Sequence, residues 1–231
     1  MRRVPEEHPR PTFLSDFILG SQDGLVNVLG ILLGLVAANA DPRVIIIAAL
    51  AALAAESISM GAVAYTSTLS RRHLYLSELE REKQEMREFP DMEREEVRVI
   101  LRNWGYEGDE VEEMLRRIEA KPKAMLELMM AFELNLPEVK ADQPLQSFTT
   151  VFFATIVGSI VPLLPFFFLG GHLLTAAYIS IGLSAVVLAV VGYYEAHTTL
   201  GITWKSAVRM VLIGLGAGFA GYLVGHFLGA A

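Results

Sequence analysis

Ionisable side chains within apolar runs are the residues of this chain best suited to chemistry. Asp23 lies in an apolar run near the N-terminus with Asn27 on its face at i+4, and Glu56 lies in a second run with Met60 one helical turn further on. A carboxylate inside a bilayer is costly unless it meets water, a cation or a partner. Carboxylates with one thioether suit a borderline ion such as Fe(II), Mn(II) or Co(II) better than magnesium or calcium.

Each of these residues also has a plainer interpretation. Asp23 would cap a helix that starts late, and Met60 would simply pack against a neighbouring helix. Glu56 is the hardest to explain in this way, because it stands well inside its apolar run. The pattern therefore favours a transport pathway through Asp23, Asn27, Glu56 and Met60.

A second set of possible metal ligands lies in the polar middle of the chain. Two glutamate pairs flank Pro90, and a fifth glutamate stands near two methionines; the set is Glu82, Glu85, Glu93, Glu96, Glu133, Met129 and Met130. The alternative is a solvated helix face balanced by arginines such as Arg81 and Arg94. A ferritin-like Glu-x-x-His motif and an EF-hand loop are both absent from the sequence.

The elements that must position these residues are membrane helices. The chain has 231 residues, 53% of them hydrophobic, and five apolar runs are long enough to cross a bilayer. These runs are residues 17–38, 44–68, 147–169, 173–195 and 206–229. The sequence lacks cysteine, so any metal site must use oxygen, imidazole or thioether ligands. We expect an all-α polytopic membrane protein whose N-terminus is not a cleaved signal peptide.

Most of the charge is concentrated between the second and third runs. Residues 71–145 hold 19 of the 26 acids and 13 of the 19 bases. Prolines and glycines divide this segment into three or four short helices, the first of which continues the second membrane run without a break. Cations gather at one set of ends, around Arg2, Arg71, Arg72 and Arg209, which predicts a cytosolic N-terminus and insertion and a C-terminus on the far side.

Together these features resemble the vacuolar iron transporter family, which includes the yeast calcium-cross-complementer type iron and manganese transporters. The similarity rests on Asp23-Gly24-Leu25-Val26, on the segment from Ala55 to Met60 and on the glutamate-rich insertion, and it extends from about Phe13 to the C-terminus. The resemblance implies five membrane helices with a cytosolic helical metal-binding insertion between the second and third. It also implies a homodimer, an ion path between subunits, and exchange of metal for protons.

Carried over residue by residue, the resemblance places Asp23 and Met60 at the family's pore aspartate and methionine. It places the five glutamates and two methionines of the insertion at the family's metal-binding positions. One departure concerns proton coupling, because Ala64 stands where relatives carry a glutamate. The expected organisation is residues 1–70 with membrane helices one and two, residues 71–145 as the metal-binding domain, and residues 146–231 with helices three to five.

The expected function is export of a divalent transition metal from the cytosol, Fe2+ first, with Mn2+ and similar ions possible, in exchange for protons. A non-coupled cation channel and a membrane-bound metal sensor or storage protein remain as alternatives. We find no pattern of an enzyme, no prosthetic group and no nucleic-acid site, because phosphate loops and histidine clusters are missing and the net charge is -7. The membrane would be the plasma membrane in a prokaryote and the vacuolar membrane in a eukaryote.

Overall fold

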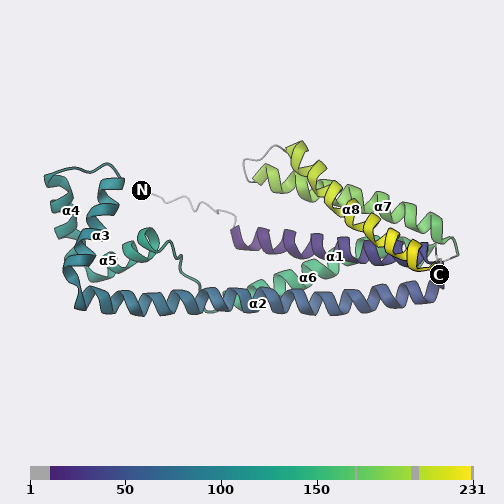
Figure 1. The fold of residues 1–231 in the computed structure, drawn as a ribbon, viewed down its shortest axis with the longest axis horizontal. Helices are drawn as coiled ribbons and strands as arrows, with labels where there is room; N and C mark the ends of the chain where they lie inside the picture. The colour runs from purple at the N-terminus through teal and green to yellow at the C-terminus, as the bar shows by residue number, and fades with distance from the viewer. Residues whose placement is uncertain (1–10, 170, 199–202, 230–231) are drawn as a thin grey trace, which may run out of the picture. The chain divides into compact units, whose positions relative to one another are not determined.

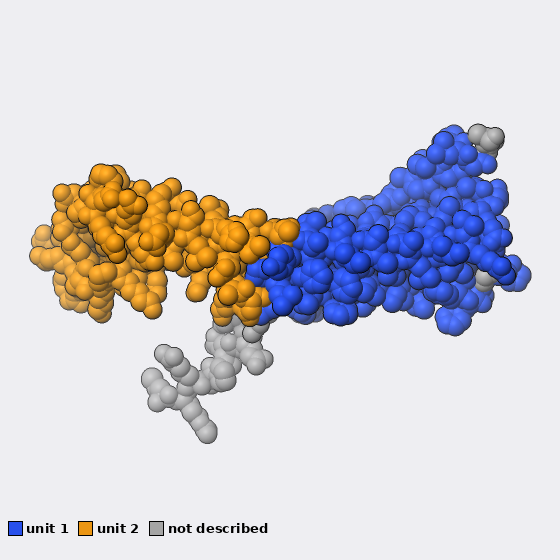
Figure 2. All heavy atoms as spheres, turned by 90° about the horizontal axis from the view of Figure 1, so that it is seen from below, with its two compact units in different colours: residues 1–65, 144–231 blue, residues 66–143 orange. Residues whose placement is uncertain are grey.

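The computed structural model describes residues 11–169, 171–198 and 203–229. These residues form eight α-helices and one π-helix and contain no strand, so the expected all-helical class is confirmed. The cations predicted to flank the first membrane helix within residues 1–10 lie outside the described residues. The chain divides into two compact units, residues 1–65 with 144–231 and residues 66–143, which are coloured separately in Figure 2.

The first unit contains the helices that are long and apolar enough to cross a membrane (Figure 1). These helices are α1 (Pro11–Ala37), α2 (Pro42–Glu88), α6 (Gln143–Phe168), α7 (Leu173–Thr198) and α8 (Thr203–Gly229). Their positions agree with the five predicted runs, so the chain is a multi-pass membrane protein. Helix α2 runs from the second apolar run to Glu88 without interruption, as expected from the lack of a helix breaker there.

The interior of this unit is a helix-packing core, while its outer face is apolar. Val28, Leu32 and Ile45 are fully buried together with Leu163 of α6. Large side chains such as Phe168, at 82% exposure, and many other apolar residues face outward. A soluble domain rarely exposes so large a continuous apolar surface, so this surface is suited to lipid.

Close helix contacts in this unit depend on glycine. A Cβ atom built on Gly158 of α6 would lie 2.0 Å from the carbonyl oxygen of Ser21 of α1, and one on Gly225 of α8 would lie 1.8 Å from the carbonyl oxygen of Gly34. The four-residue glycine spacing in α1 and α8 therefore serves contacts within one chain. From the sequence alone, this spacing could join two subunits or pack helices within one subunit, and the contacts observed here are of the second kind.

Helix α6 contains two prolines that do not break it. The positions of Pro162 and Pro165 in the sequence predict a kink or a break in the third membrane helix. Both residues lie inside a continuous α-helix from Gln143 to Phe168, so the predicted break is wrong. The hydroxyl of Ser180 on α7 donates a hydrogen bond of 2.7 Å to the carbonyl oxygen of Pro162. Neighbouring helices that bond to the backbone around a proline allow a membrane helix to continue through it.

The second unit is a small helical module. After the end of α2 it contains α3 (Pro90–Asn103), α4 (Asp109–Glu119), α5 (Pro122–Leu128) and the π-helix η1 (Met129–Glu133). The breaks fall at the predicted positions, because proline begins α3 and α5 and Gly105, with φ of +91°, follows α3. Helices α3 and α4 each bury one apolar face around Leu101 and Leu115.

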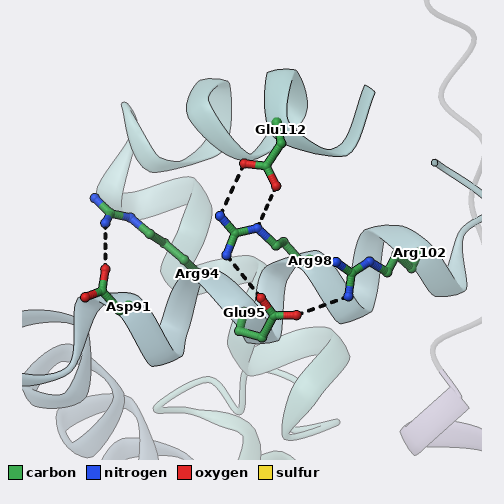
Figure 3. A network of polar contacts seen from close by, with 6 residues as sticks. All are labelled: Asp91, Arg94, Glu95, Arg98, Arg102 and Glu112. Atoms are coloured by element: carbon green, nitrogen blue, oxygen red, sulfur yellow. Dashed lines mark hydrogen bonds and ion pairs between the residues drawn. The ribbon is translucent and has the colours of Figure 1, made fainter. Parts of the chain in front are cut away.

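Arginines of α3 hold the module's polar surface together (Figure 3). Arg98 donates to Glu112 of α4 through two bonds of 2.7 and 3.2 Å and pairs with Glu95 on its own helix at 3.1 Å. Arg102 also pairs with Glu95. The two-bond contact fixes the orientation of α4 on α3 and occupies Arg98 fully.

Candidate functional site

Three of the predicted pathway residues meet between α1 and α2. The side-chain amide of Asn27 donates a hydrogen bond to Glu56 Oε1 on α2 and lies 3.4 Å from Asp23 Oδ1 on its own helix. Asp23 and Asn27 share a helix face because they are four residues apart. A single amide therefore bridges two carboxyl groups contributed by different membrane helices.

The second carboxylate oxygen of Glu56 has no partner. Glu56 Oε2 is buried, and no hydrogen bond reaches it from the described residues. Glu56 also lines a shallow depression together with Asn27 and Ser59, and the remaining walls are Ile31 and two alanines. An unsatisfied buried oxygen beside an open depression is the arrangement that a cation or a proton would complete.

Another membrane-helix carboxylate, which the sequence argument did not consider, shows the contrast. Glu195 near the end of α7 accepts a hydrogen bond of 3.0 Å from the hydroxyl of Ser206 and lies 3.6 Å from the guanidinium of Arg209. A carboxylate with both a hydroxyl donor and a cation is neutralised by its own fold. Glu195 therefore ties α7 to α8, whereas Glu56 remains incompletely satisfied.

Met60 is the pathway residue that the structure does not bring to this cluster. It lies one turn beyond Glu56 on α2 and is half-buried, but it is not among the residues that line the depression. Gly61 beside it faces the ring of Phe148 on α6, because a Cβ there would lie 3.0 Å from that ring. The assignment of Met60 as a ligand stays a prediction.

In the module, Glu82 and Glu93 form a buried carboxyl pair. The chain turns at Phe89 and Pro90, so that Glu82 on α2 and Glu93 on α3 come into hydrogen-bonding contact. Their exposed fractions are only 2% and 1%, and one oxygen of each carboxyl group is buried without a hydrogen-bond partner. Two carboxyl groups in such contact must share a proton or a cation.

The module's arginines do not neutralise this pair. Arg81 pairs with Glu78 at 2.8 Å and with Glu85 at 3.6 Å. Arg94 pairs with Asp91 at 2.9 Å and with Glu119. Arg81 thus balances Glu85 of the glutamate set, but neither arginine forms an ion pair with Glu82 or Glu93 among the described residues. The burial of Glu82 and Glu93 is inconsistent with a solvated face.

Proton affinity in the module follows from this burial. Burial, followed by the hydrogen bond and charge of Glu82, raises the pKa of Glu93 to about 8. Although Glu133 is exposed as a residue, partial desolvation of its carboxyl and the charge of Glu96 raise its pKa to about 7. The pKa of Glu96 is also raised, first by burial and then by Glu82. Glu93 and Glu133 therefore hold protons near neutral pH when no metal competes.

Of the remaining predicted ligands, Glu85, Glu96 and Glu133 lie close enough to interact electrostatically with the pair. Met129 and Met130 are buried, and Met129 also belongs to the module core. Both lie in the π-helix η1 with Glu133 at its end, and π-helical turns often occur at functional sites. Within the described ranges, no three His, Cys, Asp or Glu side chains are already gathered to hold a metal ion. Metal binding here would require some side-chain movement.

Comparison with known proteins gives a consistent result. A profile of the VIT family matches residues 14–226. The chain is 34% identical to "Vacuolar iron transporter 1" of Eucalyptus grandis over 226 residues, which cover 96% of this chain and 90% of that protein. It is 33% identical to the Arabidopsis thaliana protein of the same name, covering 90% and 82% of the two chains. It is 26% identical to "Protein CCC1" of Saccharomyces cerevisiae, covering 93% and 69%.

Proposed function

Because this chain belongs to the VIT family, and is thus a transporter and not an enzyme, we propose that it exports a divalent transition metal from the cytosol. Fe(II) is the first candidate, since similar proteins are named vacuolar iron transporters. Mn(II) and related ions would use the same carboxylate and thioether chemistry.

One observation carries the transport proposal. Asn27 bridges Asp23 and Glu56 across two membrane helices while Glu56 Oε2 is left buried and unpaired beside a depression. A membrane protein gains nothing in stability from an unsatisfied carboxylate, so a permeating cation is the natural partner. Met60 would add a soft ligand one turn further along α2.

The module would capture metal before it enters the membrane. A divalent ion that displaces the shared proton of Glu82 and Glu93 would satisfy their buried oxygens. Glu85, Glu96 and Glu133 interact electrostatically with this pair and would help to balance the charge of a bound cation. Met129 and Met130 would supply thioether ligands. The module is therefore proposed as a cytosolic metal-binding domain between the second and third membrane helices.

Release would use protons from the far side. A protonated carboxyl group is a poor ligand, so an acidic compartment would discharge metal from Asp23 and Glu56 and return protons to the cytosol. Ala64, which replaces the glutamate expected from the family pattern, lowers the number of carboxylates available for this exchange. The proton stoichiometry of this chain is therefore expected to differ from that of relatives that carry the glutamate.

A homodimer would complete the pathway by doubling Asp23 and Met60 around a two-fold axis. The described cations Arg71, Arg72 and Arg209 support a cytosolic position of the module by the positive-inside rule. By the names of its relatives, the compartment that receives the metal would be a vacuole in a eukaryote. In a prokaryote the protein would lie in the plasma membrane.

The test is metal uptake by sealed liposomes that contain the purified chain. Fe(II) is kept reduced, the lumen is made acidic or left neutral, and Asp23→Ala is compared with the wild type. Asp16→Ala is the matched control, because Asp16 lies two turns earlier on α1 and outside the Asn27 cluster. We expect gradient-stimulated uptake in the wild type and in the control, and only the level of protein-free liposomes in Asp23→Ala.

Other results would identify the alternatives. Uptake that ignores the pH gradient would indicate a non-coupled cation channel. Metal binding without uptake would favour a membrane-bound sensor or storage protein, and normal uptake by Asp23→Ala would refute the proposed pathway.

A further inference from the structure

The module also contains a cavity whose charged lining is mainly basic, in contrast to the predicted metal-binding glutamates. It encloses about 470 Å³ between the end of α2, the start of α3, the end of α4 and the start of α5. Its apolar lining includes Met86 and Met125, which belong to the edge of the module core. None of the predicted metal-binding residues lines it.

The polar lining of this cavity is basic. Lys83, Arg87, Arg94 and Lys123 contribute four cations, against the single carboxylate of Glu119. Helix α3 begins at this cavity without a side-chain cap, and its first turn carries the acidic residues Asp91 and Glu93, so the helix start itself adds no net positive charge. Arg94 is held by Glu119 and Asp91, so the cations of this lining that a ligand could engage are Lys83, Arg87 and Lys123.

Several of these cations are available to a ligand. In the part of the chain that the structure describes, Arg87 forms no ion pair and no side-chain hydrogen bond. Lys83 lies 3.2 Å from Glu80 and Lys123 lies 3.7 Å from Glu127, and both carboxylates are more than two-thirds exposed. Exposed ion pairs contribute little free energy, so an anion bound in the cavity could take the place of Glu80 and Glu127 as the partner of these lysines.

We propose that this cavity binds a small organic anion, with an apolar body on the methionines and a phosphate or carboxylate group between Lys83 and Arg87. The cavity volume falls within the range of small-molecule sites, and a mostly apolar lining with a few charged groups is their usual composition. The anion is either a soluble phosphate ester or the headgroup of an anionic lipid.

The test uses the full chain in nanodiscs of zwitterionic lipid, titrated calorimetrically with 1-naphthyl phosphate. The Lys83→Gln/Arg87→Gln variant removes two cavity cations. The Arg116→Gln/Lys121→Gln variant removes two exposed cations that do not line the cavity, so it controls for net charge. We expect the first variant to bind the probe at least about tenfold more weakly, while the control binds it as the wild type does.

Two further ligands define the chemistry and the source. Inorganic phosphate should bind more weakly than the naphthyl ester, because it lacks the apolar body. Displacement of the ester by dihexanoyl phosphatidic acid below its micelle concentration would assign the site to a lipid headgroup, and lack of displacement would assign it to a soluble ester. Equal probe binding by all three proteins, or phosphate binding as tight as ester binding, would overturn the proposal.

Discussion

At the residue scale, the burial of Glu82 and Glu93 favours a pair of metal ligands over a solvated glutamate face. Both are almost fully buried, and each keeps one oxygen without a partner. Desolvation of a charged carboxylate is so unfavourable that the metal-free pair retains a proton. In the proposed function, the same carboxyl groups would bind either protons or a divalent cation.

This exchange makes the stability of the module depend on pH. The pKa of Glu93 is raised from 4.5 to about 8, and that of Glu133 from 4.5 to about 7. Between pH 4.5 and these raised pKa values, the folded state therefore binds more protons than the unfolded state. The contribution of these two carboxyl groups to the free energy of unfolding is complete below about pH 4.5 and is lost as the pH rises towards about 8. We expect the metal-free module to melt at a lower temperature at pH 8 than at pH 6. Bound Fe(II) should raise the melting temperature at pH 8 and so reduce this difference.

Fluorescence of Trp104, whose ring centroid lies 4.8 Å from that of Phe132, reports melting of the module in a Trp204→Phe background. Glu93→Gln should flatten the pH dependence and weaken metal binding by roughly tenfold or more, whereas Glu107→Gln, on an exposed loop, should change neither. A pH-independent wild-type melting temperature would contradict this account of the pair.

At the element scale, the position of α1 depends on backbone contact with α6. Gly24 of α1 faces the carbonyl oxygen of Thr155, and Gly158 of α6 faces that of Ser21. Asp23 lies between these two contacts along α1. Any side chain at either glycine must therefore push apart the two helices, one of which carries Asp23 and Asn27.

Gly158→Ala should accordingly destabilise the membrane unit by about 1–3 kcal/mol and lower metal uptake, because overpacking shifts α1. Thermal denaturation followed by Trp204 fluorescence and the liposome assay would measure the two effects. Gly182→Ala on α7 is the matched control, since a Cβ there meets nothing within 4 Å. Equal stability and uptake of the two variants would show that α1 and α6 can accommodate the added methyl group, and would contradict this prediction.

At the scale of the whole molecule, the distribution of charge predicts the orientation in the membrane. Arg71 and Arg72 follow the apolar part of α2, and Lys205 and Arg209 lie in the first turns of α8. The turn between α6 and α7 carries His172 and no Lys or Arg among its described residues. Loops that hold Lys and Arg stay in the cytosol during insertion. The module and the α6–α7 turn should therefore lie on opposite sides of the bilayer.

The absence of cysteine from the sequence makes this orientation easy to measure. A single cysteine at exposed Glu110 (Glu110→Cys) should react with a membrane-impermeant maleimide only from the cytosolic side, and His172→Cys only from the other side. Inside-out and right-side-out vesicles would give complementary labelling. Labelling of both positions from the same side would contradict the five-span topology.

Local sequence codes predicted much of this molecule. Apolar runs long enough to cross a bilayer gave the five membrane helices, and prolines and glycines gave the breaks of the module at Pro90, Gly105 and Pro122. The sequence also identified Asp23, Asn27 and Glu56 as candidate site residues, because polar and ionisable groups stand out in apolar runs. These features depend on neighbours in the chain, so they can be read without a tertiary structure.

Other features depended on which distant side chains meet. Only the tertiary structure decided that Asn27 bridges two helices, that Glu82 and Glu93 are buried while Arg81 and Arg94 pair elsewhere, and that α6 continues through its prolines. It also assigned the glycine contacts to one chain and gathered four cations around a cavity. Burial and pairing are set by long-range packing, which residue spacing alone does not encode.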